Sequence, residues 1–92
     1  MRAKAGAELE ALEAELRYAL LELKNMSSKS RATSLLEAQA DWEKFRDSEA
    51  TFASLSWEGG SGAPLIYLAT KIELTEQRLK ALALAKAEIE SR

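Results

Sequence analysis

The sequence contains no cysteine and no histidine. Without cysteine the chain has no disulfide cross-links, and the two absences together remove the usual ligands of zinc, copper and haem. They also exclude a nucleophile paired with histidine and remove the commonest general base. We therefore expect no cofactor and no metal centre, and the residues do not indicate an enzyme.

The sequence also lacks a strong excess of either charge, because 13 basic and 15 acidic residues leave a net charge of −2. Proteins that bind nucleic acid normally show a basic excess or stripe, so we expect no nucleic-acid partner. No apolar run approaches the roughly 20 residues that span a membrane, so we expect no membrane insertion. The charged first residues lack a following apolar core and form no signal peptide in this chain, while earlier removal of one remains open.

Proline and glycine are scarce, with one proline and four glycines in 92 residues. The segments between them are rich in Ala, Leu, Glu and Lys, which favour helix. Apolar residues recur there at three- and four-residue steps, which predicts helices at roughly 7–25, 30–56 and 63–90. The short connections indicate an all-α, antiparallel up-down-up bundle with a long hairpin of the second and third helices, in one domain spanning 1–92.

The apolar stripes of these helices predict the core. The stripe of the first helix is Leu9, Leu12, Leu16, Leu20 and Leu23. The near-heptad stripe of the second is Leu35, Ala38, Trp42, Phe45, Glu49 and Phe52. The stripe of the third is Leu65, Leu68, Ile72, Thr75, Leu79, Leu82, Lys86 and Ile89. The alternative interpretation is an exposed seam for a partner or for self-association.

Helix ends are marked by only a few residues. The second helix has two candidate starts, since Ser30 is one possible cap while Ser34 and Glu37 form a capping-box pattern. Its end is marked by the glycine cluster, in which a glycine readily adopts the left-handed conformation. Pro64 suits the first turn of the third helix, where its missing N–H costs no hydrogen bond.

A polar set interrupts the apolar stripes of the hairpin. On antiparallel helices joined near Gly60, positions equally distant from the turn face each other, so Arg46 is expected near Thr75. Buried charges are costly unless they are paired and hydrogen-bonded. We therefore predict a structural clasp that fixes the helix register, and a ligand or catalytic site is the alternative. Its members are Trp42, Arg46, Asp47, Glu49, Thr75 and Arg78.

The glycine-rich connection is most simply a turn between helices. It is unlike a phosphate-binding loop because it has neither the lysine nor the preceding strand. The alternative is a protruding loop that enters another protein's cleft. The residues of this candidate contact loop are Trp57, Glu58, Gly59, Gly60, Ser61 and Gly62.

Three separated motifs carry a family resemblance. The run Ala38-Gln39-x-x-Trp42-x-x-Phe45-Arg46-Asp47-x-Glu49, followed by Gly59-Gly60-Ser61 and Leu74-Thr75-x-x-Arg78, resembles the LprI-type lysozyme inhibitor family over roughly Leu35 to Leu79. The first helix departs from the family's Leu-Asn-x-x-Tyr pattern, because no Asn precedes Tyr18 at that spacing. The family's two cysteines correspond to Ala50 and Thr70, which is consistent with loss of one disulfide.

This resemblance implies a non-catalytic, secreted or periplasmic bacterial domain whose partner is lysozyme or another cell-envelope protein. The candidate contact loop would then enter the partner's cleft, and replacing Trp57 and Ser61 is expected to weaken binding without loss of helicity. The alternative is a structural or interaction module that forms homo-oligomers through its Leu-rich seams.

Overall fold

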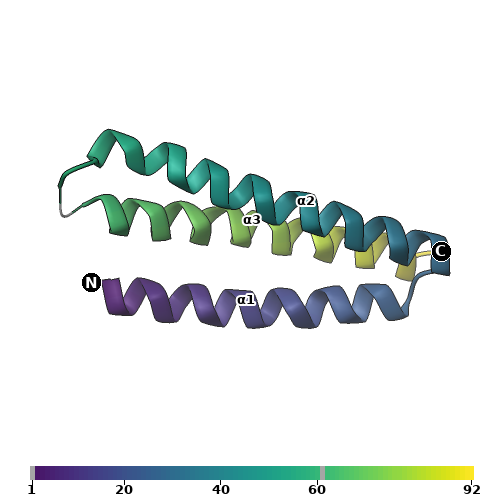
Figure 1. Ribbon diagram of the computed structural model, residues 1–92. Coiled ribbons are helices and arrows are strands. Elements are labelled where there is room, and N and C mark those ends of the chain that lie inside the picture. The colour runs from purple at the N-terminus through teal and green to yellow at the C-terminus, as the bar shows by residue number, and fades with distance from the viewer. Residues whose placement is uncertain (1, 61) are drawn as a thin grey trace.

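The computed structural model describes residues 2–60 and 62–92. Three long helices account for most of them: α1 (Arg2–Asn25), α2 (Lys29–Ser54) and α3 (Ala63–Glu90). A short 3-10 helix, η1 (Leu55–Trp57), continues α2 toward the glycine-rich connection. Figure 1 shows that α1 and α3 run in the same direction while α2 runs in the opposite one. The predicted all-α, antiparallel up-down-up bundle is confirmed.

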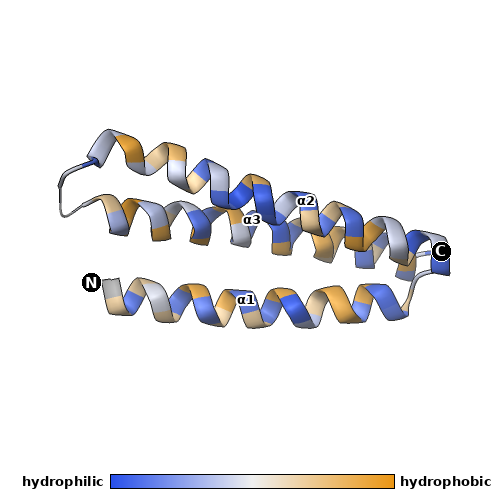
Figure 2. Ribbon diagram, in the orientation of Figure 1, coloured by the Kyte–Doolittle hydropathy of each residue, from blue (hydrophilic) through white to orange (hydrophobic). Residues whose placement is uncertain are grey.

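The molecule is a rod of 50 × 22 × 16 Å in which α3 has the central position. α3 packs along both other helices, whereas α1 and α2 make little contact with each other. The hydrophobic residues of α1 recur along the edge that is turned toward the other two helices (Figure 2). This arrangement leaves the two ends of the rod as separate surfaces.

The core lies where the stripes of α1 and α3 meet. Leu16 and Leu23 of α1 are buried against Leu82 of α3. Leu35 and Trp42 of α2 pack against this cluster from the third side. The predicted stripes of α1 and α3 are confirmed, because all of their members are buried or half-buried.

The predicted stripe of α2 is confirmed at Leu35 and Trp42 and is wrong by one residue at its other positions, which are Ala38, Phe45, Glu49 and Phe52. Phe45 is 53% exposed and Phe52 is 70% exposed, while the buried residues of α2 are Gln39, Arg46 and Ala50. One residue corresponds to about 100° around a helix, which moves the aromatic side chains to the outer face. The cause is that α2 buries two polar side chains that find partners, and a hydropathy pattern does not detect such positions.

The helix boundaries differ from the predicted ones mainly at the N-terminal ends of the helices. α1 begins at Arg2 rather than near residue 7. Neither predicted cap of α2 is used, because Ser28 is the N-cap and its hydroxyl accepts a bond of 3.3 Å from the Arg31 backbone N–H. Gly59 has a φ of 84°, and Pro64 lies in the first turn of α3, so both predictions about the hairpin connection are confirmed.

Candidate functional site

Arg46 of α2 joins all three helices through one guanidinium group. Its side chain is only 7% exposed. Nη1 donates to Glu13 Oε2 of α1 at 3.1 Å and to Thr75 Oγ1 of α3 at 3.4 Å. Nε donates to Asp47 Oδ1 at 3.0 Å. The positive charge is therefore compensated by two carboxylates that are themselves partly in contact with water.

Two arginine side chains lie close to the ring of Trp42. The guanidinium carbon of Arg46 lies 5.3 Å from the centre of its ring, and that of Arg78 lies 5.9 Å away. These distances are typical of cation–π contacts. Arg78 Nε also donates to Gln39 Oε1 at 2.9 Å. Burial lowers the pKa of Arg78. The side chain stays charged because the ordinary pKa of arginine lies far above neutral pH.

Asp47 links this cluster to the outer part of α3. Its Oδ1 lies 3.3 Å from Lys71 Nζ, and the same ammonium group lies 5.2 Å from the ring centre of Tyr67. We call the whole set the Arg46 network. It consists of Glu13, Gln39, Trp42, Arg46, Asp47, Lys71, Thr75 and Arg78.

The structure brings together five of the six residues predicted for the clasp. Glu49 is the exception: it is exposed, and within the described ranges it forms no ion pair. Sequence reasoning missed Glu13, Gln39 and Lys71. Gln39 carried a signal, because it precedes Arg46 by seven residues, a spacing that keeps two residues on one helix face.

The Arg46 network supplies hydrogen-bond partners for its own buried polar groups. Among the residues described here, every buried side-chain nitrogen and oxygen has a hydrogen-bond partner. The same residues hold no group of three His, Cys, Asp or Glu side chains suited to a metal ion. Buried polar networks whose groups are all hydrogen-bonded rigidify the packing around them.

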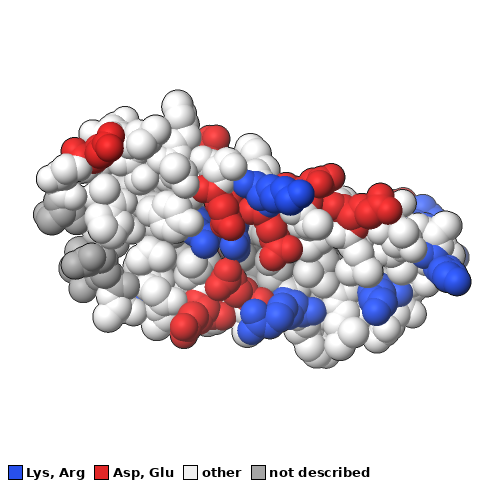
Figure 3. Space-filling model, viewed as in Figure 1, with Lys and Arg blue, Asp and Glu red and all other residues white. Residues whose placement is uncertain are grey.

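The hairpin end of the rod, in contrast to the Arg46 network, exposes large apolar side chains and has few charges. Phe52 is 70% exposed, Leu55 54% and Trp57 52%. From Thr51 to Thr70 the sequence has a single charged residue, Glu58, although 30% of the whole chain is charged. Figure 3 shows the same contrast, with charged side chains gathered along the middle of the rod and a mostly uncharged hairpin end.

Trp57 contacts two glycines of the connection at this end. Its ring lies so close to Gly62 that an added Cβ at Gly62 would come within 2.9 Å of Trp57 Cε3. The Gly60 backbone N–H donates to the Trp57 carbonyl at 3.0 Å. The described residues of the connection from Leu55 to Gly60 are all exposed. We call this region the hairpin-end surface; it consists of Phe52, Leu55, Trp57, Glu58, Gly59, Gly60 and Gly62.

The predicted contact loop is largely contained in the hairpin-end surface, and Ser61 lies outside the described residues. Sequence reasoning missed Phe52 and Leu55, because the apolar pattern of α2 assigned Phe52 to the core. Contiguous exposed apolar side chains on a small protein commonly mark a site of protein interaction. Across the described part of the chain, no helix is long and apolar enough to cross a membrane.

The chain matches the model of a known protein family. The model of the family described as lysozyme inhibitor LprI matches residues 1–82, which confirms the resemblance seen in the motifs. The match also extends through α1, beyond the Leu35–Leu79 range that the motifs cover, despite the missing Asn of the first helix. Searches of curated proteins and of solved structures returned no match.

Proposed function

The chain belongs to the LprI lysozyme-inhibitor family, and from this we propose that it binds a lysozyme and blocks the catalytic cleft with its hairpin-end surface. The observation that carries the proposal is the exposure of Phe52, Leu55 and Trp57 on a segment with one charge. Lysozymes act on cell walls, so the proposal implies that the protein works in secreted or periplasmic form.

The shape of the hairpin end suits entry into a cleft. The rod is 22 × 16 Å across, and its tip is the narrow connection between α2 and α3 at the left of Figure 1. A lysozyme cleaves a glycosidic bond between two carboxyl groups and needs the polysaccharide to occupy its cleft. A protein tip that fills this space prevents substrate binding without any chemistry of its own.

The residue types of the hairpin end also suit such a contact. Trp57 has an apolar body and an N–H donor, the combination that makes tryptophan frequent among residues dominating binding energy. Gly59 and Gly60 are exposed and carry no side chain, so a partner can approach the backbone of the connection closely. Apolar burial around Trp57 would therefore supply most of the affinity.

Two leucines of equal exposure provide a matched test of this surface. Leu55 in η1 and Leu21 in α1 are each 54% exposed, and only Leu55 belongs to the hairpin-end surface. We expect Leu55→Gln to raise the inhibitor concentration for half-maximal inhibition by at least about 5-fold, as is typical of a contact that matters. Leu21→Gln should leave it unchanged, and circular dichroism should show equal helicity in both.

Equal potency of the two leucine variants would show that the hairpin end is not part of the interface with lysozyme. Inhibition by the parent protein would then have to come from another surface. Trp57→Ala gives a second, independent reading of the same surface, and we expect it to weaken inhibition more than Leu55→Gln because a larger contact area is lost.

A second candidate function is self-association through the outer face of α2. Phe45 and Phe52 are both largely exposed and are seven residues apart, which aligns them on one helix face. Burial of this face in a homodimer would remove both rings from water. Light scattering over a wide concentration range tests it: rising molar mass that Phe45→Gln abolishes supports the dimer, and a constant monomer mass contradicts it.

A further inference from the structure

A pocket of about 220 Å³ opens at the end of the rod opposite the hairpin, where the α1–α2 connection meets the last turns of α3. Its apolar walls come from all three helices and consist of Leu23, Leu35, Ala85 and Ile89. Its polar lining is limited to the side chains of Ser27, Ser34 and Arg31. No carboxylate lines this pocket.

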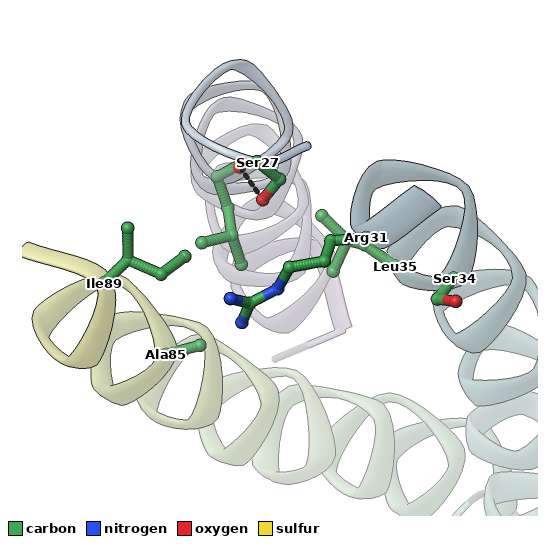
Figure 4. Close-up of a pocket in the computed structure, with 7 residues that line it drawn as sticks. Ser27, Arg31, Ser34, Leu35, Ala85 and Ile89 are labelled. Atoms are coloured by element: carbon green, nitrogen blue, oxygen red, sulfur yellow. Dashed lines mark hydrogen bonds between the residues drawn. The ribbon is translucent and has the colours of Figure 1, made fainter. Parts of the chain in front are cut away.

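Arg31 is the only charged residue in the lining. Figure 4 shows its side chain reaching from α2 toward Ala85 and Ile89 on α3. In the described part of the chain, no carboxylate lies within ion-pair distance of its guanidinium, whereas Arg46 and Arg92 are both paired. Arg31 is exposed overall, and its guanidinium brings five N–H donors to the pocket lining without an anionic partner among the described residues.

Of the two hydroxyl groups in the lining, that of Ser27 is not available as a donor to a ligand. Ser27 Oγ already donates its proton to the Leu23 carbonyl at 2.6 Å. Lys24, in the last turn of α1, and Lys29, at the start of α2, add positive charge on either side of the α1–α2 connection. Such an arrangement attracts anions and disfavours cations of the same size.

From this geometry we propose that the pocket binds a small monocarboxylate with a short apolar tail. The carboxylate pairs with Arg31, whose planar group matches two carboxylate oxygens. The tail occupies the space between Leu23, Leu35 and Ile89. An apolar cavity of about 150 Å³ holds a benzene molecule, so a pocket of this volume has room for a tail of several carbons.

This site is independent of the proposed inhibitory surface, because the two lie at opposite ends of a rod 50 Å long. Its test uses octanoate as the probe, followed by amide chemical shifts of the ¹⁵N-labelled full chain. We expect saturable shifts at Leu23, Leu35 and Ile89 with a dissociation constant of roughly millimolar, as ligand efficiency suggests for so small a molecule. Octylamine, which carries the opposite charge on the same tail, should not produce them.

Arg31→Gln and Lys29→Gln form the matched pair for the charge. Both remove one positive charge from exposed side chains near the start of α2, but only Arg31 lines the pocket. We expect Arg31→Gln to weaken octanoate binding roughly 3–10-fold, a range set by the exposure of the guanidinium, and Lys29→Gln to have little effect. Equal effects of the two variants, equal binding of octylamine, or no saturable shifts at the pocket would each overturn the proposal.

Discussion

Arg46 is the residue through which α2 is tied to both of its neighbours. Its guanidinium contacts Glu13 of α1, Thr75 of α3 and its own neighbour Asp47. A buried charge of this kind contributes little net stability compared with a well-packed apolar side chain. Removing it is nevertheless destabilising, because its carboxylate partners are left without a positive charge to pair with. We therefore propose that the Arg46 network fixes the register of the three helices.

Removing Arg46 tests this proposal in the folded protein. We expect Arg46→Ala to lower the free energy of unfolding by about 2–3 kcal/mol, below the full value for a buried pair because Glu13 and Asp47 remain partly solvated. Lys44→Ala, an exposed change on the same helix, should alter it by less than about 0.5 kcal/mol. Urea denaturation measures both, and a similar small effect of the two would contradict the clasp.

Lys86 and Glu22 form a second link, between α3 and α1, with Nζ and Oε2 3.1 Å apart. The hydrogen bond to Glu22 raises the pKa of Lys86. A raised pKa in the folded state means that the pair stabilises the protein fully below the unfolded pKa of about 10.4. This contribution is lost as the pH rises through the folded pKa.

Lys86→Gln should therefore lower the melting temperature at pH 8 but not at a pH above the folded pKa of Lys86. The comparison is made between the variant and the parent at each pH, so that ionisation of tyrosine and of other lysines affects both proteins. A difference in melting temperature that stays constant across this range would show that the pair contributes nothing through its charge.

At the scale of the helices, periodicity predicted which segments are helical and which faces of α1 and α3 are buried. On α2 it placed Leu35 and Trp42 correctly. It failed where Gln39 and Arg46 are buried while Phe45 and Phe52 are exposed. Glu13 was missed for a related reason: its partner is on α2, and only the three-dimensional arrangement brings α1 within reach of Arg46. Patterns within one helix contain no information about such pairings.

Two glycines test the helices and their connection with the same substitution. Gly59 has a φ of 84°, which strains any other residue, so Gly59→Ala should cost about 1 kcal/mol of unfolding free energy. Gly6 lies inside α1, with open space where a Cβ would be placed, so Gly6→Ala should stabilise the protein by about 0.5 kcal/mol. Thermal unfolding distinguishes the two, and effects of the same sign would contradict this assignment of backbone conformation.

At the scale of the whole molecule, the rod has two chemically different ends separated by the Arg46 network. The hairpin end is nearly uncharged and exposes large apolar side chains, whereas the other end has a pocket with Arg31 in its lining. The motifs identified the hairpin connection as a candidate contact loop. They gave no sign of the pocket, because its walls are contributed by residues from three helices that are far apart in the sequence.

The most direct test of the proposed function is lysis of bacterial cell walls by animal and bacterial lysozymes while the full chain is titrated in. We predict saturable inhibition of at least one of these enzymes at nearly stoichiometric amounts, because a tip that fills the cleft competes with the polysaccharide for one site. Undiminished lysis by every enzyme at large excess of the protein would contradict the inhibitory function.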